Sequence, residues 1–478
     1  MTPLDKNVKA VKKILKSEDI LVFEFASDGG KKFAAIYADG ICNKEQLGEL
    51  VVKPLRSAES KDGFEKVRLL LASPEVKEGK KIPDAIKEIS DGNAVLFIDG
   101  EDDYLIIGLK CPPARAVAEP PTQIAVKGPR EGFIEEIKTN MGLVRKRIKT
   151  DKLQIKTLKC GKQSDTAVAL VYIEGICPKG LPEKVEKEIA ENKIDLVPDS
   201  SYISAFISKR PRSLFKRCAT SEKPDVFCAK VSEGRVGILV DGSPIAITVP
   251  YMLVEDFQTA EDYYSSSYRA TTLRALRFFS IILGIFLPAI YISAQLFKAQ
   301  LIPFRLLLKI SSSVQGLPLS PSIEMFLTLL VLEILNEASI RMPKYVGLAL
   351  SVVGALVLGD TAVKAGIIST PAIIIIAFSA ICLYTVPDLV ETTTTFRWIF
   401  LIVAGSIGPF GVVLLSAFVI SYLVTEHSYG VPLMAPFAPV VKNDLLDSMV
   451  KANMYSLKNR PEILRSRDKV RLKSENKR

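Results

Sequence analysis

The sequence predicts an α+β N-terminal part, made of two related α/β subdomains, followed by an α-helical polytopic membrane domain. Three observations support this fold class. Residues 1–270 mix charged residues with short runs of strand formers, whereas residues 275–440 are mostly apolar. Short sequence words recur within the N-terminal part. The chain has 478 residues, which is too long for one ordinary domain.

The first subdomain is expected over residues 1–115. Residues 19–26 (DILVFEFA) alternate and are rich in strand formers, and residues 44–55 repeat apolar residues along one side of a helix. Further strands are expected at residues 32–37, 94–98 and 104–110. A Pro-rich segment, residues 111–121, ends the subdomain as a stiff link.

The second subdomain is expected over residues 116–265. Its opening motif consists of Gly128, Pro129, Arg130 and Glu131. Residues 130–148 are expected to form a long amphipathic helix, because acids crowd the first turns and bases the last, which matches the helix dipole. The elements expected after it are a helix at residues 183–192 and strands at residues 153–158, 166–173, 226–230, 235–240 and 245–249.

Two pairs of sequence words indicate that the subdomains are related. Residues 37–42 read YADGIC and residues 172–177 read YIEGIC, and each word ends a strand before a helix. Residues 95–100 (VLFIDG) are matched by residues 237–242 (GILVDG). Similar words at similar offsets indicate two copies of one fold, although words this short also match by chance.

The membrane domain is expected over residues 266–440. Its first apolar run, residues 278–297, contains Pro288, which predicts a kink because proline removes one helix hydrogen bond. Residues 301–319 are shorter and amphipathic. They are expected to lie in the membrane interface or to re-enter the membrane rather than to span it.

Residues 320–341 carry charges within a helix of membrane length. About twenty residues are enough to cross a hydrocarbon core of about 30 Å. Glu333, Glu337 and Arg341 are four residues apart and therefore share one face. A charge near the bilayer centre costs at least ~2.5 kcal/mol, so it needs a partner, water or a function. Glu337 and Arg341 also fit an interfacial position, because Pro343 ends the helix nearby, whereas Glu333 lies in mid-span.

The next apolar segments are residues 345–368 and 372–386. In the first of them Asp360 and Lys364 are again four residues apart, as a pair in or near the membrane. Small residues recur in the same segment and favour close helix contacts.

The last apolar run, residues 398–424, is interrupted at Gly408 and Pro409, which predicts a hinge or a re-entrant break. The tail, residues 441–478, is basic: it holds eleven Lys/Arg and five Asp/Glu, so 11 − 5 = +6. The positive-inside rule places such a tail in the cytoplasm. The start of the chain lacks an apolar signal segment, so we expect both ends in the cytoplasm and about four spans, or six if the amphipathic segment crosses.

The composition disfavours several functional classes. The seven cysteines are scattered without a CxxC pair, which suits a reducing compartment rather than a disulfide framework or a zinc site. His427 is the only histidine, and no nucleotide-binding, hydrolase or metalloprotease motif occurs. We therefore expect no enzyme activity, no metal site and no cofactor. Nucleic-acid binding is disfavoured because the basic tail lacks the aromatic pattern of such sites.

Six blocks of sequence carry a resemblance to a known family. They are residues 128–148 (GPREGFIEEIKTNMGLVRKRI), 233–244 (EGRVGILVDGSP), 249–264 (VPYMLVEDFQTAEDYY), 333–343 (EILNEASIRMP), 352–369 (VVGALVLGDTAVKAGIIS) and 428–439 (SYGVPLMAPFAP). In this order they resemble the A subunits of spore-germination nutrient receptors, the GerA family. The match is looser over roughly the first 100 residues.

The resemblance implies a membrane subunit in the inner membrane of the spore. Such a subunit works with a transporter-like B subunit that senses the nutrient and with a lipoprotein C subunit. It is thought to form a homo-oligomer, a pentameric ring, that conducts monovalent cations when nutrient opens it. The resemblance extends to a sister protein, the stage V sporulation protein AF, which would lack nutrient specificity of its own.

Two functions remain open from the residues themselves. In an oligomer, Glu333, Glu337 and Asp360 could form acidic rings, which favour cations in a pore. Alternatively these acids pair within one chain, with Arg341 and Lys364 as partners, and the protein is a non-conducting signalling or scaffold subunit. An enzyme is the weakest interpretation because no catalytic grouping was found.

Overall fold

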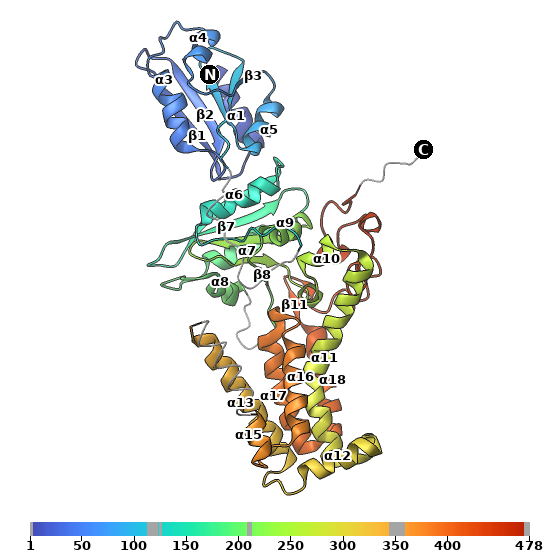
Figure 1. Cartoon of the computed structure of the whole chain (residues 1–478). Coiled ribbons are helices and arrows are strands. Elements are labelled where there is room, and N and C mark those ends of the chain that lie inside the picture. Colours follow the sequence, from blue (N-terminus) through green and yellow to red (C-terminus); the bar gives the residue numbers. More distant parts are fainter. Residues whose placement is uncertain (1–2, 112–122, 124–126, 208–212, 344–358, 473–478) are drawn as a thin grey trace.

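The computed structural model describes residues 3–111, 123, 127–207, 213–343 and 359–472. Two α/β subdomains are stacked above a bundle of helices, and the chain after the bundle returns to the lower subdomain (Figure 1). The predicted boundary between residues 115 and 116 lies outside the described residues.

The first subdomain is a five-stranded sheet with helices on both faces. The strand order is β1-β2-β4-β5-β3, and every neighbouring pair is antiparallel. Helices α1 and α5 pack on one face, and α2 to α4 on the other. The elements are α1 (Pro3–Ile14), β1 (Ile20–Ala26), β2 (Lys32–Ala38), α2 (Lys44–Leu47), a π-helical turn (Gly48–Val52), α3 (Lys53–Leu55), α4 (Phe64–Leu70), β3 (Val76–Gly79), α5 (Ile82–Asp91), β4 (Ala94–Ile98) and β5 (Tyr104–Ile107).

The second subdomain repeats this plan. Its sheet has the order β6-β7-β9-β10-β8, which corresponds to the first sheet strand for strand. Helices α6 and α9 cover one face, and α7 and α8 the other. The elements are α6 (Ile137–Arg147), β6 (Leu153–Cys160), β7 (Thr166–Ile173), α7 (Leu181–Ala190), α8 (Ser200–Ile207), β8 (Ala219–Ser221), α9 (Pro224–Ser232), β9 (Val236–Val240) and β10 (Ala246–Val249). The two subdomains therefore share one topology.

Two predicted elements of the second subdomain are wrong. The helix expected over residues 130–148 begins only at Ile137, because the preceding chain folds back and Glu131 pairs with bases of the last turn. The strand expected over residues 226–230 is part of α9. Pro224 starts this helix, and its buried residues lie at helical spacing toward the sheet.

The helical part is centred on α11, a helix of 31 residues that is about 46 Å long at 1.5 Å per residue. A core between α11, α13, α16, α17 and α18 holds the bundle together. The elements are a 3₁₀ turn (Leu253–Phe257), α10 (Ala260–Tyr264), α11 (Ser267–Phe297), a 3₁₀ turn (Ala299–Leu301), α12 (Phe304–Val314), α13 (Pro321–Arg341), α15 (Gly359–Lys364), α16 (Thr370–Leu383), a 3₁₀ turn (Pro387–Leu389), α17 (Val390–Ile407) and α18 (Pro409–Thr425).

The helix expected over residues 320–341 is confirmed as α13, with Ser320 at its N-cap and Pro321 in its first turn. The segment expected over residues 345–368 lies largely outside the described residues, so only α15 and the chain after it can be compared. Among the described residues, α11 is the one helix that is long and apolar enough to cross a membrane. The pair formed by α16 and residues 387–407, bent by 108°, would count together as a second.

The chain after the bundle packs against the second subdomain and the start of α11. It holds a short hairpin, β11 (His427–Ser428) and β12 (Val431–Pro432), and 3₁₀ turns at Asp444–Leu446, Met454–Ser456 and Glu462–Leu464. Leu464 and Ser466 are buried, and Ser466 donates a hydrogen bond of 2.5 Å to the Glu233 carbonyl oxygen. The described part of the basic tail is thus a structural element of the second subdomain.

Candidate functional site

Glu333 of α13 pairs with Arg397 of α17, a residue that the sequence analysis did not single out. The Glu333 carboxylate and the Arg397 guanidinium form an ion pair, in which the arginine side chain is 2% exposed and the glutamate side chain 26% exposed. An arginine buried to this degree needs a partner, because removing an unpaired charge from water costs several kcal/mol. Arg397 directly precedes the apolar run of residues 398–424, where a cation fits the membrane interface, so the sequence pattern did not mark it as a buried charge.

Arg397 also contacts α16. Its Nη1 donates to Ser379 Oγ at 3.4 Å, and the Ser379 hydroxyl donates to the Gly284 carbonyl oxygen of α11 at 2.5 Å. Groups from four helices are therefore joined in one chain of contacts. We call Glu333, Arg397, Ser379 and the Gly284 carbonyl the cross-bundle network.

Pro288 explains why the Gly284 carbonyl is free to accept. In an α-helix the N–H of each residue donates to the carbonyl four residues earlier, and proline has no N–H. Helix α11 continues through Pro288, so the Gly284 carbonyl loses its partner within the helix. The Ser379 hydroxyl takes that place. The residue expected to kink the helix is thus also the reason that α11 is bonded to α16.

Gly284 brings α11 and α16 close together. A Cβ atom at this position would lie 2.4 Å from Leu383 Cδ2 and 3.3 Å from the Ser379 carbonyl oxygen. A larger residue would therefore push the helices apart, beyond the reach of the Ser379 hydroxyl.

A cavity of about 140 Å³ lies beside the Glu333–Arg397 pair. Its lining comes from α13, α16 and α17 and from the turn between the last two, and it includes Asn336, Tyr384 and Thr394. The buried Nε of Arg397 has no hydrogen-bond partner among the described residues. A cavity of this size holds about four water molecules at ~30 Å³ each. Polar groups in the bundle thus face a space that water or a small ion could occupy.

The other predicted charges of the bundle pair within their own helices. Arg341 Nη2 lies 2.5 Å from Glu337 Oε1, and Lys364 Nζ lies 2.5 Å from Asp360 Oδ2. All four side chains are at least 59% exposed. Exposed pairs four residues apart contribute only ~0.3–0.5 kcal/mol in water. Within the described ranges, no three His, Cys, Asp or Glu residues are placed to hold a metal ion.

Gly408 and Pro409 lie at the turn of a helical hairpin. Gly408, with φ 74° and ψ −152°, is the single residue between α17 and α18, and few residues other than glycine adopt this conformation. Phe215 packs against Phe396 near the start of α17 and against Tyr422 near the end of α18. Because the first half of α17 and the end of α18 both contact Phe215, the two helices run antiparallel.

The motif of Gly128, Pro129, Arg130 and Glu131 lies in irregular chain before α6. Gly128, at φ 113°, approaches α10 so closely that a Cβ would lie 2.5 Å from the Tyr264 ring. Glu131 accepts from Lys146 Nζ at 2.6 Å and from Arg147 Nη2 at 2.7 Å. Burial acts to raise the pKa of Glu131, but these two cations hold it below its usual value. These contacts therefore hold the irregular segment before α6 against both α6 and α10.

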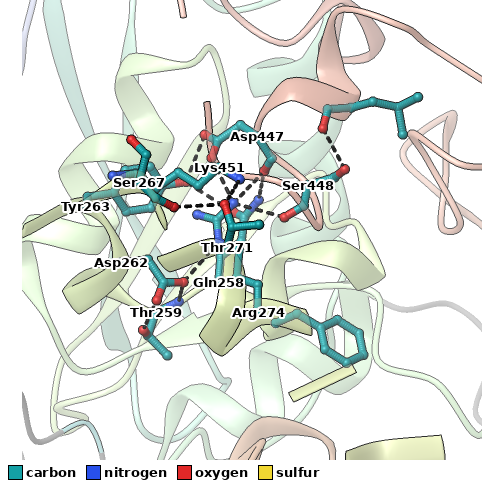
Figure 2. A network of polar contacts seen from close by, with 12 residues as sticks. Gln258, Thr259, Asp262, Tyr263, Ser267, Thr271, Arg274, Asp447, Ser448 and Lys451 are labelled. Carbon is teal, nitrogen blue, oxygen red and sulfur yellow. Dashed lines mark hydrogen bonds and ion pairs between the residues drawn. The ribbon is translucent and has the colours of Figure 1, made fainter. Parts of the chain in front are cut away.

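A buried network joins α10, α11 and the tail (Figure 2). Arg274 of α11 has a fully buried side chain whose Nε donates to Asp262 Oδ2 at 3.0 Å and whose Nη1 donates to Asp447 Oδ1 at 2.9 Å. Arg277 Nη1 also donates to Asp262, at 2.9 Å. Burial acts to raise the pKa of Asp262, but the two guanidinium groups hold it below its usual value. We call this set the junction network.

A second buried cluster lies between the second subdomain and the bend between α16 and α17. Lys216 Nζ lies 2.8 Å from Asp256 Oδ1 and 3.7 Å from Asp388 Oδ1. The Tyr251 hydroxyl donates to Asp256 Oδ2 at 2.5 Å. Burial raises the pKa of Asp256 to about 6, with Asp388 adding to the effect and Lys216 opposing it. Sequence spacing gave no signal for this cluster, because its charged members Lys216, Asp256 and Asp388 are far apart in the chain.

Comparison with known proteins finds relatives that match nearly the whole chain. A family model described as "Bacillus/Clostridium GerA spore germination protein" matches residues 9–463. Spore germination protein KA of Bacillus subtilis is 33% identical over 477 residues, which cover 98% of this chain and 88% of that protein. The membrane protein YfkQ of the same organism is 31% identical over 448 residues, 93% of this chain and 87% of that protein. A crystal structure of the N-terminal domain of the A subunit of the Bacillus megaterium spore germinant receptor GerK3 is similar at a TM-score of 0.40 and 23% identity, covering 52% of this chain and 94% of that one.

Proposed function

The chain belongs to the GerA family of spore germination proteins, and we propose that it is the membrane subunit of a germinant receptor that oligomerises into a nutrient-gated channel for monovalent cations. Its role lies in spore germination, and it is not an enzyme. The proposal places it in the inner membrane of the spore as a multi-pass protein with both ends in the cytoplasm. Its domains would be residues 1–115, 116–265, 266–440 and 441–478.

The observation that carries the channel proposal is the partly exposed Glu333 beside a polar cavity. Its carboxylate is partly exposed and lines this cavity. Helix α13, which carries it, leans away from the other helices of the bundle (Figure 1). Several copies of the chain around an axis would repeat this carboxylate as a ring, and acidic rings favour cations. Arg397 would hold the acid in the closed state, and a movement of α13 would release it.

Exposed apolar side chains support an oligomer. Ile334 and Ile340 of α13 are 58% and 80% exposed, and Phe410, Val413 and Phe418 of α18 are about 70% exposed. In a membrane these faces contact either lipid or neighbouring subunits. We propose that part of this surface joins copies into a pentamer, and that a transporter-like B subunit and a lipoprotein C subunit complete the receptor.

A second candidate is a non-conducting signalling or scaffold subunit. The observation in its favour is that Glu333, Glu337 and Asp360 all have a basic partner within the same chain. In that case the acids stabilise the fold and no ring of free carboxylates forms.

Ion flux and mass measured on one preparation separate the two candidates. The purified chain is reconstituted in liposomes with its partner subunits, and potassium efflux is recorded with and without nutrient. Glu333→Lys should abolish or invert cation flux, whereas Glu49→Lys, at an exposed glutamate of the first subdomain, should leave it unchanged. Unchanged flux in Glu333→Lys, or a monomeric protein without conductance, would favour the scaffold. Conduction that needs neither nutrient nor a B subunit would instead indicate the sporulation paralogue.

A further inference from the structure

Helix α12 stands apart from the rest of the bundle. It follows α11 after one 3₁₀ turn and extends sideways at the foot of the bundle, far from the α/β subdomains (Figure 1). Ile310 is the one residue of this helix that is buried. Apart from Ile310 and the half-buried Leu307 and Val314, the residues of α12 are exposed in the described part of the chain.

One side of α12 is apolar. At 100° per residue, Phe304 and Leu308 fall on one flank of the apolar arc and Leu306 on the other. Their side chains are 72%, 55% and 51% exposed, respectively. Apolar surface of this extent is unfavourable in water, at about 25 cal/mol per Å², so it is suited to lipid chains or to another protein.

The opposite side of α12 is basic. Arg305 and Lys309 are one helical turn apart on it, and residues 298–319 contain three bases and no acid. Within the described residues, neither Arg305 nor Lys309 forms an ion pair. The segment therefore carries uncompensated positive charge next to exposed apolar side chains.

The positive charge of residues 298–319 is unusual for the place that α12 occupies in the membrane. Helix α11 starts at the junction network and is about 46 Å long, more than the hydrocarbon core of about 30 Å. Its far end and α12 thus lie at the opposite membrane surface from the subdomains. Short loops on that side normally carry few Lys and Arg, so the three bases need a local source of negative charge.

We propose that α12 lies flat on the far leaflet and binds the headgroups of anionic phospholipids. Phe304 and Leu308 enter the acyl-chain region, and Arg305 and Lys309 contact the phosphates. This is the arrangement of an interfacial amphipathic helix. It fixes the foot of α11 in the membrane and makes the depth of the bundle depend on lipid charge.

Lipid quenching of a single tryptophan tests the proposal in the full-length chain. Trp398 is the only tryptophan, so Trp398→Phe combined with Leu308→Trp places the one fluorophore on α12. The protein is reconstituted in vesicles of equal parts phosphatidylglycerol and phosphatidylcholine, with bromine on one lipid at a time. Each base near an anionic surface favours binding about fivefold, so brominated phosphatidylglycerol should quench several-fold more strongly.

Arg305→Gln with Lys309→Gln should make the two lipids quench equally, and high salt should do the same without any change in the helix. The matched control is Lys9→Gln with Lys13→Gln, two exposed bases one turn apart on α1, which should keep the preference. Equal quenching by the two lipids in the protein that retains Arg305 and Lys309 overturns the proposal. Quenching by neither lipid also overturns it, and a disulfide between copies carrying Ser312→Cys would then show that a second copy covers α12.

Discussion

Asp19 of the first subdomain and Arg145 of the second form an ion pair that is enclosed on all sides. Arg145 Nε lies 2.6 Å from Asp19 Oδ2 and Nη2 lies 2.7 Å from Oδ1, and the two side chains are 0% and 1% exposed. The neighbouring residues continue the contact, since the Glu18 N–H donates to the Ile155 carbonyl oxygen of edge strand β6. The subdomains are thus held by a bidentate contact that water does not reach.

The first prediction concerns this pair. Asp19→Asn should lower the free energy of unfolding by about 3–5 kcal/mol, because Arg145 would remain buried without a counter-charge. Urea unfolding of the full chain in detergent, followed by circular dichroism, measures the change. Asp102→Asn is the control: Asp102 is exposed, so a change within about 0.5 kcal/mol is expected. Equal effects of the two substitutions would contradict the structural role of the pair.

The second prediction concerns Glu333 and Arg397. Arg397→Gln should lower stability by several kcal/mol, since it leaves Glu333 beside the bundle core without its partner. The exchange Glu333→Arg with Arg397→Glu should recover part of the loss, because it restores opposite charges across the same gap. Thermal stability in detergent, read by the fraction that remains soluble, gives the order of the three proteins. An exchange variant no more stable than Arg397→Gln would argue against a direct pair.

The third prediction concerns Pro288 and Ser379. Ser379→Ala should cost about 1–3 kcal/mol in the natural chain, because the buried Gly284 carbonyl loses its donor. In a Pro288→Ala background the same change should cost less, because the backbone N–H of the introduced alanine can then donate to that carbonyl. A double-mutant cycle on unfolding free energies measures the coupling. Strict additivity would mean that Pro288 and Ser379 do not share the Gly284 carbonyl.

The fourth prediction is a dependence of stability on pH. The pKa of Asp256 is raised from 3.8 to about 6 in the folded protein, so between these values the folded state binds more protons than the unfolded one. Its contribution to stability is therefore largest below pH ~4, decreases as pH rises to about 6, and is constant above that. The total change is about 3 kcal/mol.

Asp256→Asn removes this titration, so the difference in unfolding free energy between the natural chain and the variant should follow that curve. The groups around Asp256, namely Lys216, Asp388 and Tyr251, are retained in the variant. A difference that does not vary between pH 4 and 6 would show that Asp256 titrates elsewhere.

The fifth prediction concerns the hairpin turn at Gly408. Gly408→Ala should destabilise the bundle by at least ~1–3 kcal/mol, because alanine is strained at this backbone conformation. Its Cβ would also lie 2.7 Å from the Phe297 ring. Gly359→Ala is the control, since a Cβ there meets no described atom within 4 Å. Proteolysis of the chain in detergent should reveal faster cleavage near residue 408 only in the first variant.

Four of the five strands in each sheet could be predicted, because each is a short run of strand formers next to a turn, whereas the short edge strands β3 (Val76–Gly79) and β8 (Ala219–Ser221) hold too few apolar residues to be recognised. Gly40, Gly100, Gly175 and Gly242 all have positive φ where the repeated words place a turn. The strand predicted at residues 226–230 is wrong, because a short apolar run fits a strand and a buried helix equally well. Pro224 before that run was the helix signal, and it outweighs the β-forming residues.

The candidate site was predictable only in part. Glu333 could be found because a carboxylate in a membrane-length helix is unusual. Its partner Arg397 is 64 residues away, and no spacing rule connects the two. The four-residue spacing of Glu333, Glu337 and Arg341 predicted a pair between Glu337 and Arg341, which the structure shows, but it offered Glu333 no adjacent cation. Local periodicity identifies which residues share a helix face, whereas the packing of separate helices decides which charges meet.

The junction network has a consequence for how the chain is made. Arg274 is synthesised soon after its partner Asp262, but Asp447 and Ser448, which accept hydrogen bonds from Arg274 Nη1, are added more than 170 residues later. At 5–20 residues per second, a nascent chain holds Arg274 without Asp447 and Ser448 for at least ~9 s. Completion of the tail therefore adds the last partners of an arginine that until then is paired with Asp262 of α10 alone.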